Sequence, residues 1–133
     1  MRVVLDSNVY ISALLVGRGC EEILALARAR VVEVLSSEGI LEEVASVLKK
    51  TFRWNSADIR LLSEELRDLC TMVPGDPGAT EFPPDPADAK ILSCAIAGKA
   101  DVIVTGDRKH LLPLKRYQGI PVVSPAEFLE QIG

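Results

Sequence analysis

Two aspartates stand directly after apolar segments that read as strands. Asp6 follows the run Val3 to Leu5, and Asp107 follows the run Val102 to Thr105 after one glycine. If both runs are parallel strands of one sheet, both carboxylates lie at its carboxyl edge, where open α/β sheets build their sites. Each aspartate also has a simpler possible role, because an aspartate after a strand commonly caps the following helix.

A third carboxylate, Glu43, lies beside the apolar face of a predicted helix. Ile40, Val44, Val47 and Leu48 recur at helical spacing, and Glu43 falls at the margin of the face that they form. Glu42 points about 100° away, toward solvent. A glutamate beside an apolar face either extends to water or has a partner, so Glu43 is the stronger candidate of the two.

The fourth candidate, Asp88, belongs to the helix that Pro86 opens. Asp85 is suited to cap this helix, and Pro86 fits its first position, which puts Asp88 in the first turn. A carboxylate there is stabilised by the helix dipole. The same position projects Asp88 from a helix end near the sheet edge, where it could bind a cation.

Four carboxylates without cysteine or histidine form a set of oxygen ligands, which suits Mg²⁺ or Mn²⁺ better than zinc. Carboxylate-bound ions of this kind can support phosphodiester hydrolysis by water. His110, the only histidine, lies in a charged stretch and is interpreted as a surface residue. The sequence has no GxxxxGK[ST] phosphate loop, which excludes nucleotide hydrolysis of that type.

The 133 residues, with 48% hydrophobic and 26% charged content, predict one ordinary globular domain. No apolar run approaches the ~20 residues of a membrane span, and the chain opens on a strand-like segment, so we expect a cytoplasmic protein without a membrane partner. Three widely spaced cysteines are expected to be buried free thiols, Cys20, Cys70 and Cys94.

The net charge of -4 is unusual for a nucleic-acid enzyme, because phosphate binding favours a basic surface. Bound cations would offset part of the acidic charge. Basic residues also cluster locally in two groups, Lys49, Lys50 and Arg53, and Arg108, Lys109, Lys115 and Arg116.

Strands and helices alternate along the chain, which predicts a three-layer α/β/α sandwich with a mainly parallel central sheet. Further strands are expected at residues 32–35 and 122–123. The first helix is expected after Ser7, which can cap it. Further helices are expected through residues 23–31, at 40–48, 55–70 and 86–97, near 108–112, and after the capping signal Ser124-Pro125-Ala126-Glu127. Residues 74–86 hold five of the eight prolines and are expected to form a loop.

At these acids the sequence resembles the PIN-domain family, in particular the VapC-like toxin ribonucleases. The segment VVLDSNVYISALL resembles the first motif, a strand ending at an aspartate before an apolar helix. The segment SEGILEEVASVL resembles the second acidic motif and selects Glu43 over Glu42. The segment DPADAKILSCAIAGKADVIVTGD resembles the last two motifs, with Asp88 and Asp107, and its end is the most specific match. Together the motifs cover nearly the whole chain.

The resemblance implies a single PIN-like domain over residues 1–133 that cleaves RNA with Mg²⁺ or Mn²⁺. It further implies the toxin of a toxin–antitoxin pair, often a homodimer, which a small antitoxin holds inactive. The metal ligands carried over are Asp6, Glu43, Asp88 and Asp107, and the weaker polar supports are Asn8, Thr105 and Ser7. Many members have a basic residue where this chain has Gly106, and Arg108 is the candidate to replace it.

Two other readings remain open. Asp6-Ser7-Asn8-Val9 resembles the nucleophile motif of haloacid-dehalogenase-type phosphatases, but that motif has a second aspartate where this chain has Asn8. The chain could also be a catalytically silent PIN-like interaction module, in which the acids cap helices or bind a regulator. Retention of all four acids argues against the second reading, and a response to manganese would separate it from a nuclease.

Overall fold

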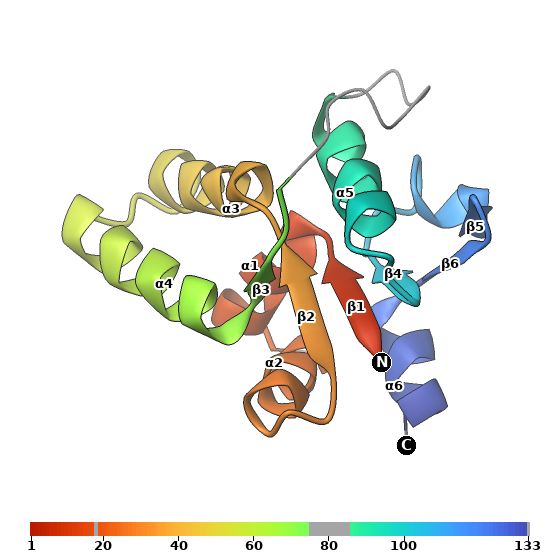
Figure 1. The fold of residues 1–133 in the computed structure, drawn as a ribbon. Helices are drawn as coiled ribbons and strands as arrows, with labels where there is room; N and C mark the ends of the chain where they lie inside the picture. Colours follow the sequence, from red (N-terminus) through yellow and green to blue (C-terminus); the bar gives the residue numbers. More distant parts are fainter. Residues whose placement is uncertain (18, 75–85, 133) are drawn as a thin grey trace.

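A six-stranded sheet with helices packed around it forms the computed structural model, which describes residues 1–17, 19–74 and 86–132 (Figure 1). The strands are β1 (Arg2–Leu5), β2 (Glu33–Ser36), β3 (Thr71–Met72), β4 (Val102–Val104), β5 (Arg116–Tyr117) and β6 (Ile120–Val123). The helices are α1 (Ser7–Leu15), α2 (Cys20–Arg28), α3 (Glu38–Lys50), α4 (Ser56–Leu69), α5 (Pro86–Ala97), α6 (Pro125–Ile132) and the 3-10 helix η1 (Leu112–Leu114).

The strand order is β3-β2-β1-β4-β6-β5, with β1 at the centre between β2 and β4. Four neighbouring pairs are parallel, and the β5–β6 pair is antiparallel. The mainly parallel sheet and the α/β class expected from the sequence are therefore confirmed. Because β1 and β4 pair with Leu5 opposite Val104, the residues that follow these two strands emerge side by side.

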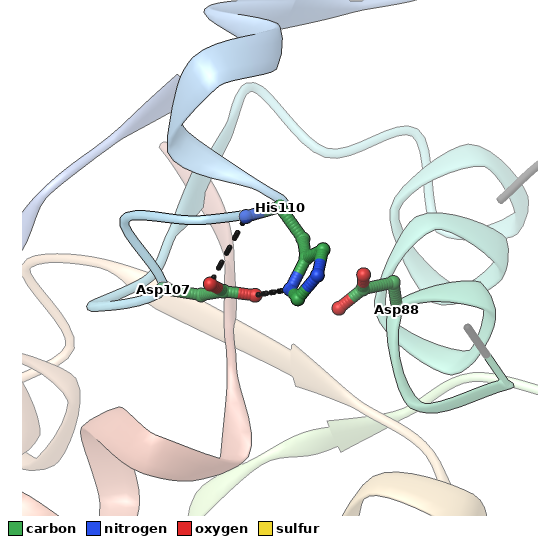
Figure 2. A group of neighbouring side chains, drawn as sticks. All are labelled: Asp88, Asp107 and His110. Atoms are coloured by element: carbon green, nitrogen blue, oxygen red, sulfur yellow. Dashed lines mark hydrogen bonds and ion pairs between the residues drawn. The ribbon is translucent and has the colours of Figure 1, made fainter. Parts of the chain in front are cut away.

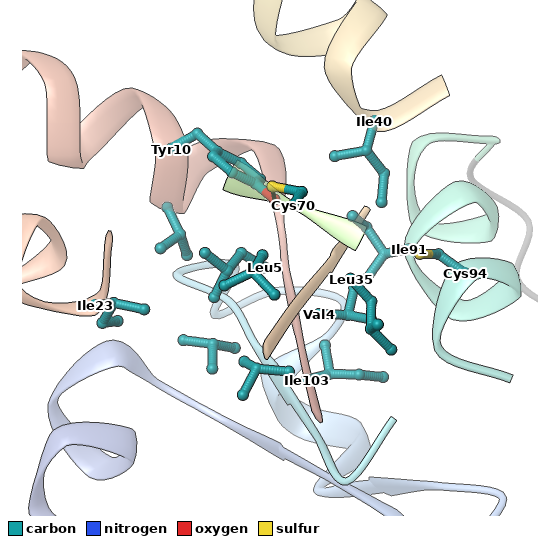
Figure 3. Close-up of a cluster of buried hydrophobic side chains, with 14 of the residues drawn as sticks. Val4, Leu5, Tyr10, Ile23, Leu35, Ile40, Cys70, Ile91, Cys94 and Ile103 are labelled. Atoms are coloured by element: carbon teal, nitrogen blue, oxygen red, sulfur yellow. Dashed lines mark hydrogen bonds between the residues drawn. The ribbon is translucent and has the colours of Figure 1, made fainter. Parts of the chain in front are cut away.

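The core lies on both faces of the central strands, because consecutive side chains from Val3 to Leu5 of β1 and from Val102 to Val104 of β4 are apolar and buried. Val3, Val4 and Leu5 of β1 are fully buried, as expected for a strand covered on two sides. Figure 3 shows Ile91 of α5 on one side of β1 and β2, and Ile23 of α2 on the other. The three cysteines are free and buried, as expected.

The C-terminal part differs from the sequence-based expectation in two places. The short helix expected near residues 108–112 is a turn followed by η1, because Pro113 lacks the backbone N–H that a longer helix needs. The strand expected at 122–123 is longer, and β5 pairs with it as a hairpin. Gln118 (φ 47°) and Gly119 (φ 82°) form its two-residue turn, in the left-handed region that such hairpins favour. Strand β3, which follows α4 in the chain, was also not expected from the sequence.

Helix caps explain where the elements near the sheet edge begin. Asp6, and not Ser7, is the N-cap of α1, and its carboxylate accepts the backbone N–H of Ser7. The capping box before α6 is confirmed, because Ser124 and Glu127 exchange hydrogen bonds between side chain and backbone.

The loop expected at 74–86 and the cap expected at Asp85 lie almost wholly outside the described residues. Among the described helices, none is long and apolar enough to cross a membrane.

Candidate metal centre

The Asp6 carboxylate is buried at the carboxyl end of β1, where several donors hold it. Its Oδ1 accepts the backbone N–H of Ser7 at 2.7 Å. Its Oδ2 accepts the hydroxyl of Thr105 at 2.7 Å and the side-chain amide of Asn8 at 3.2 Å. Asp6 is thus the helix cap that the sequence suggested, and its carboxylate is also held at the sheet edge.

Burial raises the pKa of Asp6, because a charged carboxylate loses solvation there. The hydrogen bonds from Thr105 and Ser7 act in the opposite direction, and the nearby charges of Glu43 and Asp107 raise the pKa further. The net effect is a raised pKa. A buried carboxylate under repulsion from two others is a place where a bound cation relieves electrostatic cost.

Glu43 reaches this carboxylate through Ser7. The Ser7 hydroxyl donates a hydrogen bond to Glu43 Oε2 at 2.7 Å and makes a longer contact of 3.4 Å with Asp6 Oδ1. Glu43 is half-buried on α3, whereas Glu42 is exposed. The exposure of Glu42 and the partial burial of Glu43 agree with the helical phase expected from the sequence.

Asp107 stands in the loop after β4, where backbone amides orient it. Its Oδ1 accepts the N–H groups of Lys109 at 3.0 Å and His110 at 3.1 Å. Partial burial alone would raise the pKa of Asp107, but these two amides and the His110 ring outweigh it and hold the pKa below its ordinary value. Asp107 therefore stays ionised and available to a cation.

Asp88 is buried in the first turn of α5 and faces the Asp107 loop. Ligand atoms of Asp88, Asp107 and His110 all lie within 4.8 Å of one another (Figure 2). The structure thus brings together all four acids that the sequence singled out: Asp6 with Glu43 through Ser7, Asp6 with Asp107 through Thr105, and Asp107 with Asp88.

The three polar residues Asn8, Thr105 and Arg108 differ in how closely they contact the acids. Asn8 bridges two elements, because its amide donates to Asp6 while its oxygen accepts the N–H of Gly106 at 3.0 Å. Thr105 is fully buried between Asp6 and Asp107. Arg108 is exposed on the turn after Asp107, so its suggested phosphate contact stays a prediction.

His110 is a neighbour of the candidate acids that sequence reasoning missed. Its side chain is 60% exposed, as expected of a surface residue, but its Nδ1 lies 3.4 Å from Asp107 Oδ2. The interpretation that set it apart from the acids is therefore incomplete. Its position three residues after Asp107, in a turn, was the available signal.

The sequence matches the model of the PIN domain family over residues 2–109, so the chain belongs to this family, whose members are generally nucleases. The structure is similar to that of VapBC2 from Rickettsia felis bound to a DNA fragment from its promoter, with a TM-score of 0.64 and 18% identity over 93% of this chain and 98% of that one. It is also similar to PAE2754 from Pyrobaculum aerophilum, with a TM-score of 0.54 and 17% identity over 98% of this chain and 95% of the other. No curated protein matches the sequence.

The family match favours the interpretation of the segment around Asp6 as a PIN-domain motif over its interpretation as a phosphatase nucleophile motif. At identities of 17% and 18% the two solved structures establish the fold and leave the substrate open.

Proposed function

We propose that this protein is a divalent-metal-dependent endoribonuclease with Asp6, Glu43, Asp88 and Asp107 as metal ligands. The observation that carries the proposal is the environment of Asp6. Its buried carboxylate is held by Thr105 and Ser7, and its pKa is raised first by burial and then by the charges of Glu43 and Asp107. A cluster that repels itself in this way needs a positive charge to be stable in its ionised form.

The donor set fits Mg²⁺ or Mn²⁺, because carboxylate oxygens dominate it. When bound, such an ion lowers the pKa of a water ligand and offsets the charge that develops on a cleaved phosphodiester. The protein's own part is to hold the four carboxylates at one edge. Ser7, Asn8 and Thr105 fix the directions of the Asp6 and Glu43 carboxylates through hydrogen bonds.

RNA is the proposed substrate, as the resemblance to VapC-like ribonucleases implies. Exposed basic side chains near the acids support an anionic substrate, because Arg108 and Lys109 directly follow Asp107. The overall charge of -4 predicts that binding is weak without a metal ion.

We also propose the toxin role and its partners. The support is the resemblance of the motifs to VapC-like toxins and the fold similarity to VapBC2. A small antitoxin would then bind the protein, and a homodimer is proposed because α4 exposes Leu61, which is 62% accessible. In this proposal residues 1–133 act as one domain in the cytoplasm.

Cleavage of a broad RNA pool by the purified protein tests the activity. We expect cleavage with Mg²⁺ or Mn²⁺, none with EDTA, and none from Asp6→Asn, whose fold is checked by circular dichroism. The matched pair on α3 sharpens the test: Glu43→Gln should lose most activity, while Glu42→Gln, one residue away and exposed, should keep it. Equal activity in the wild type and Asp6→Asn would reveal a contaminating nuclease and refute the proposal.

An interaction module without catalysis is the remaining alternative. It predicts no cleavage and no need for a bound ion, whereas the proposed nuclease should gain thermal stability from Mn²⁺ through binding to the folded state. A melting temperature that is unchanged by millimolar Mn²⁺ would favour the module.

A further inference from the structure

The single histidine of the chain lies against two of the proposed metal ligands. His110 Nδ1 is 3.4 Å from Asp107 Oδ2, and ligand atoms of His110, Asp107 and Asp88 lie within 4.8 Å of one another. Figure 2 shows the imidazole ring between the two carboxylates, which come from different elements. A nitrogen donor therefore stands at a centre that the sequence predicted to hold oxygen donors alone.

The backbone at His110 is held by hydrogen bonds that do not involve its ring. The His110 N–H donates to Asp107 Oδ1 at 3.1 Å, and the Leu112 N–H donates to the Asp107 carbonyl at 2.9 Å. Leu111, the next residue, is buried in the core. This turn therefore places His110 beside Asp107, with its imidazole near the carboxylates of both Asp107 and Asp88.

We propose that His110 is a nitrogen ligand of the cation held by Asp88 and Asp107, and that it shifts the preference of the centre from Mg²⁺ toward Mn²⁺ and Co²⁺. The inference rests on the proposed function for the presence of a cation. Imidazole suits transition metals, and affinity at nitrogen-containing sites rises from Mn²⁺ to Co²⁺. Mg²⁺ prefers oxygen ligands and retains several waters, so it gains little from the imidazole.

The alternative for His110 is an exposed ion pair that only helps to close the turn. Exposed pairs contribute little to stability, and such a pair would affect all divalent ions alike. The two roles therefore differ in a measurable quantity, the ratio of the dissociation constants for Mg²⁺ and Co²⁺.

The first experiment observes the ring nitrogens directly. Because the chain has one histidine, ¹⁵N-labelled protein gives one pair of imidazole nitrogen resonances. We expect Zn²⁺, used as a diamagnetic probe, to move one of them strongly in the wild type and not in Asp107→Asn. Saturation with Zn²⁺ without a change at either nitrogen would overturn the proposal.

The second experiment measures dissociation constants for Mg²⁺, Mn²⁺ and Co²⁺ by calorimetry. His110→Ala keeps the backbone N–H that Asp107 accepts, so the turn is retained. We expect it to weaken Co²⁺ binding by about tenfold, Mn²⁺ binding by less, and Mg²⁺ binding hardly at all. Lys109→Ala is the matched control, an exposed neighbour without a ligand atom, and it should leave the Mg²⁺ to Co²⁺ ratio unchanged. Equal weakening of all three ions by His110→Ala would refute the assignment.

Failure of this inference is distinguishable from failure of the proposed function. A protein that cleaves RNA but keeps its metal preference in His110→Ala is a nuclease in which His110 is not a ligand. A protein whose His110 resonance responds to Zn²⁺, yet which cleaves no RNA, has the nitrogen ligand and lacks the proposed activity.

Discussion

Thr105 donates its hydroxyl proton to Asp6 Oδ2 at 2.7 Å, and both side chains are buried. The same hydroxyl oxygen accepts the backbone N–H of Asp107 at 2.9 Å. A hydroxyl group can donate its single proton and accept a hydrogen bond at the same time, so Thr105 binds Asp6 and Asp107 together. One side chain thus couples the acids that follow β1 and β4.

Replacement of Thr105 by valine removes this coupling while keeping the shape of the side chain. We expect Thr105→Val to lower the free energy of unfolding by about 1–3 kcal/mol, because Asp6 and the Asp107 N–H lose a buried partner. Urea denaturation measures the loss, and Mn²⁺ affinity should fall with it. Thr105→Ser, which retains the hydroxyl, should stay near the wild type. Equal stability of the valine variant would show that the hydroxyl contributes nothing.

The raised pKa of Asp6 predicts the pH dependence of the metal-free protein. The folded state binds the Asp6 proton more tightly than the unfolded state, so this residue's contribution to stability falls as pH rises from the ordinary aspartate pKa through the raised one. Urea denaturation in EDTA across this range should show a smaller decline in Asp6→Asn. Mn²⁺ at neutral pH should restore stability in the wild type only. A decline of equal size in both proteins would show that Asp6 does not cause this pH dependence.

Asp107 is expected to act with the opposite sign. Its pKa is lowered in the folded state, so its stabilising contribution is present at neutral pH and is lost as pH falls through the folded pKa. Asp107→Asn should therefore show a shallower acid-side loss of stability than the wild type, measured by the same denaturation series. A steeper loss would mean that the backbone amides of Lys109 and His110 do not stabilise the charge.

The Ser7–Glu43 hydrogen bond predicts a variant that damages the site and spares the fold. In Ser7→Ala the Glu43 carboxylate loses its 2.7 Å donor and is free to turn toward solvent. We expect Mn²⁺ affinity to fall roughly tenfold, as for loss of a group that orients a ligand. The free energy of unfolding should change by less than about 1 kcal/mol, because the residue is only half-buried. Calorimetry measures the first quantity, and Ser7→Thr should retain most of the affinity.

Gly98, just beyond α5, predicts the converse, a variant that damages packing and spares the site. A Cβ at this position would lie 2.8 Å from Leu35 Cδ1 and 3.1 Å from the Cys94 carbonyl oxygen. Gly98→Ala should therefore destabilise the protein by about 1–3 kcal/mol in thermal or urea denaturation. Gly39→Ala is the matched control on α3, where the new methyl group meets only the flexible Lys90 side chain at 3.4 Å. It should be neutral or slightly stabilising, and equal losses in both would contradict the packing argument.

Much of the fold and of the acidic site could be predicted from local sequence. Buried strands read as apolar runs, and parallel pairing then brings Asp6 and Asp107 to one edge. The phase of α3 placed Glu43 at the margin of the apolar face and Glu42 toward solvent, because helical periodicity is a local property. The hairpin of β5 and β6 was missed, because two-residue strands carry too little periodic pattern.

What the sequence by itself determined is the identity of the acids and the edge on which they meet. Only the tertiary structure decided how they are held: the Ser7–Glu43 bond joins residues 36 apart, and the Thr105–Asp6 bond joins residues 99 apart. Directional contacts of this kind depend on ångström-scale placement of whole elements, which residue type and spacing do not encode. The same reason applies to His110. The sequence shows that residue 110 is a histidine, but only the tertiary structure places its ring between Asp107 and Asp88.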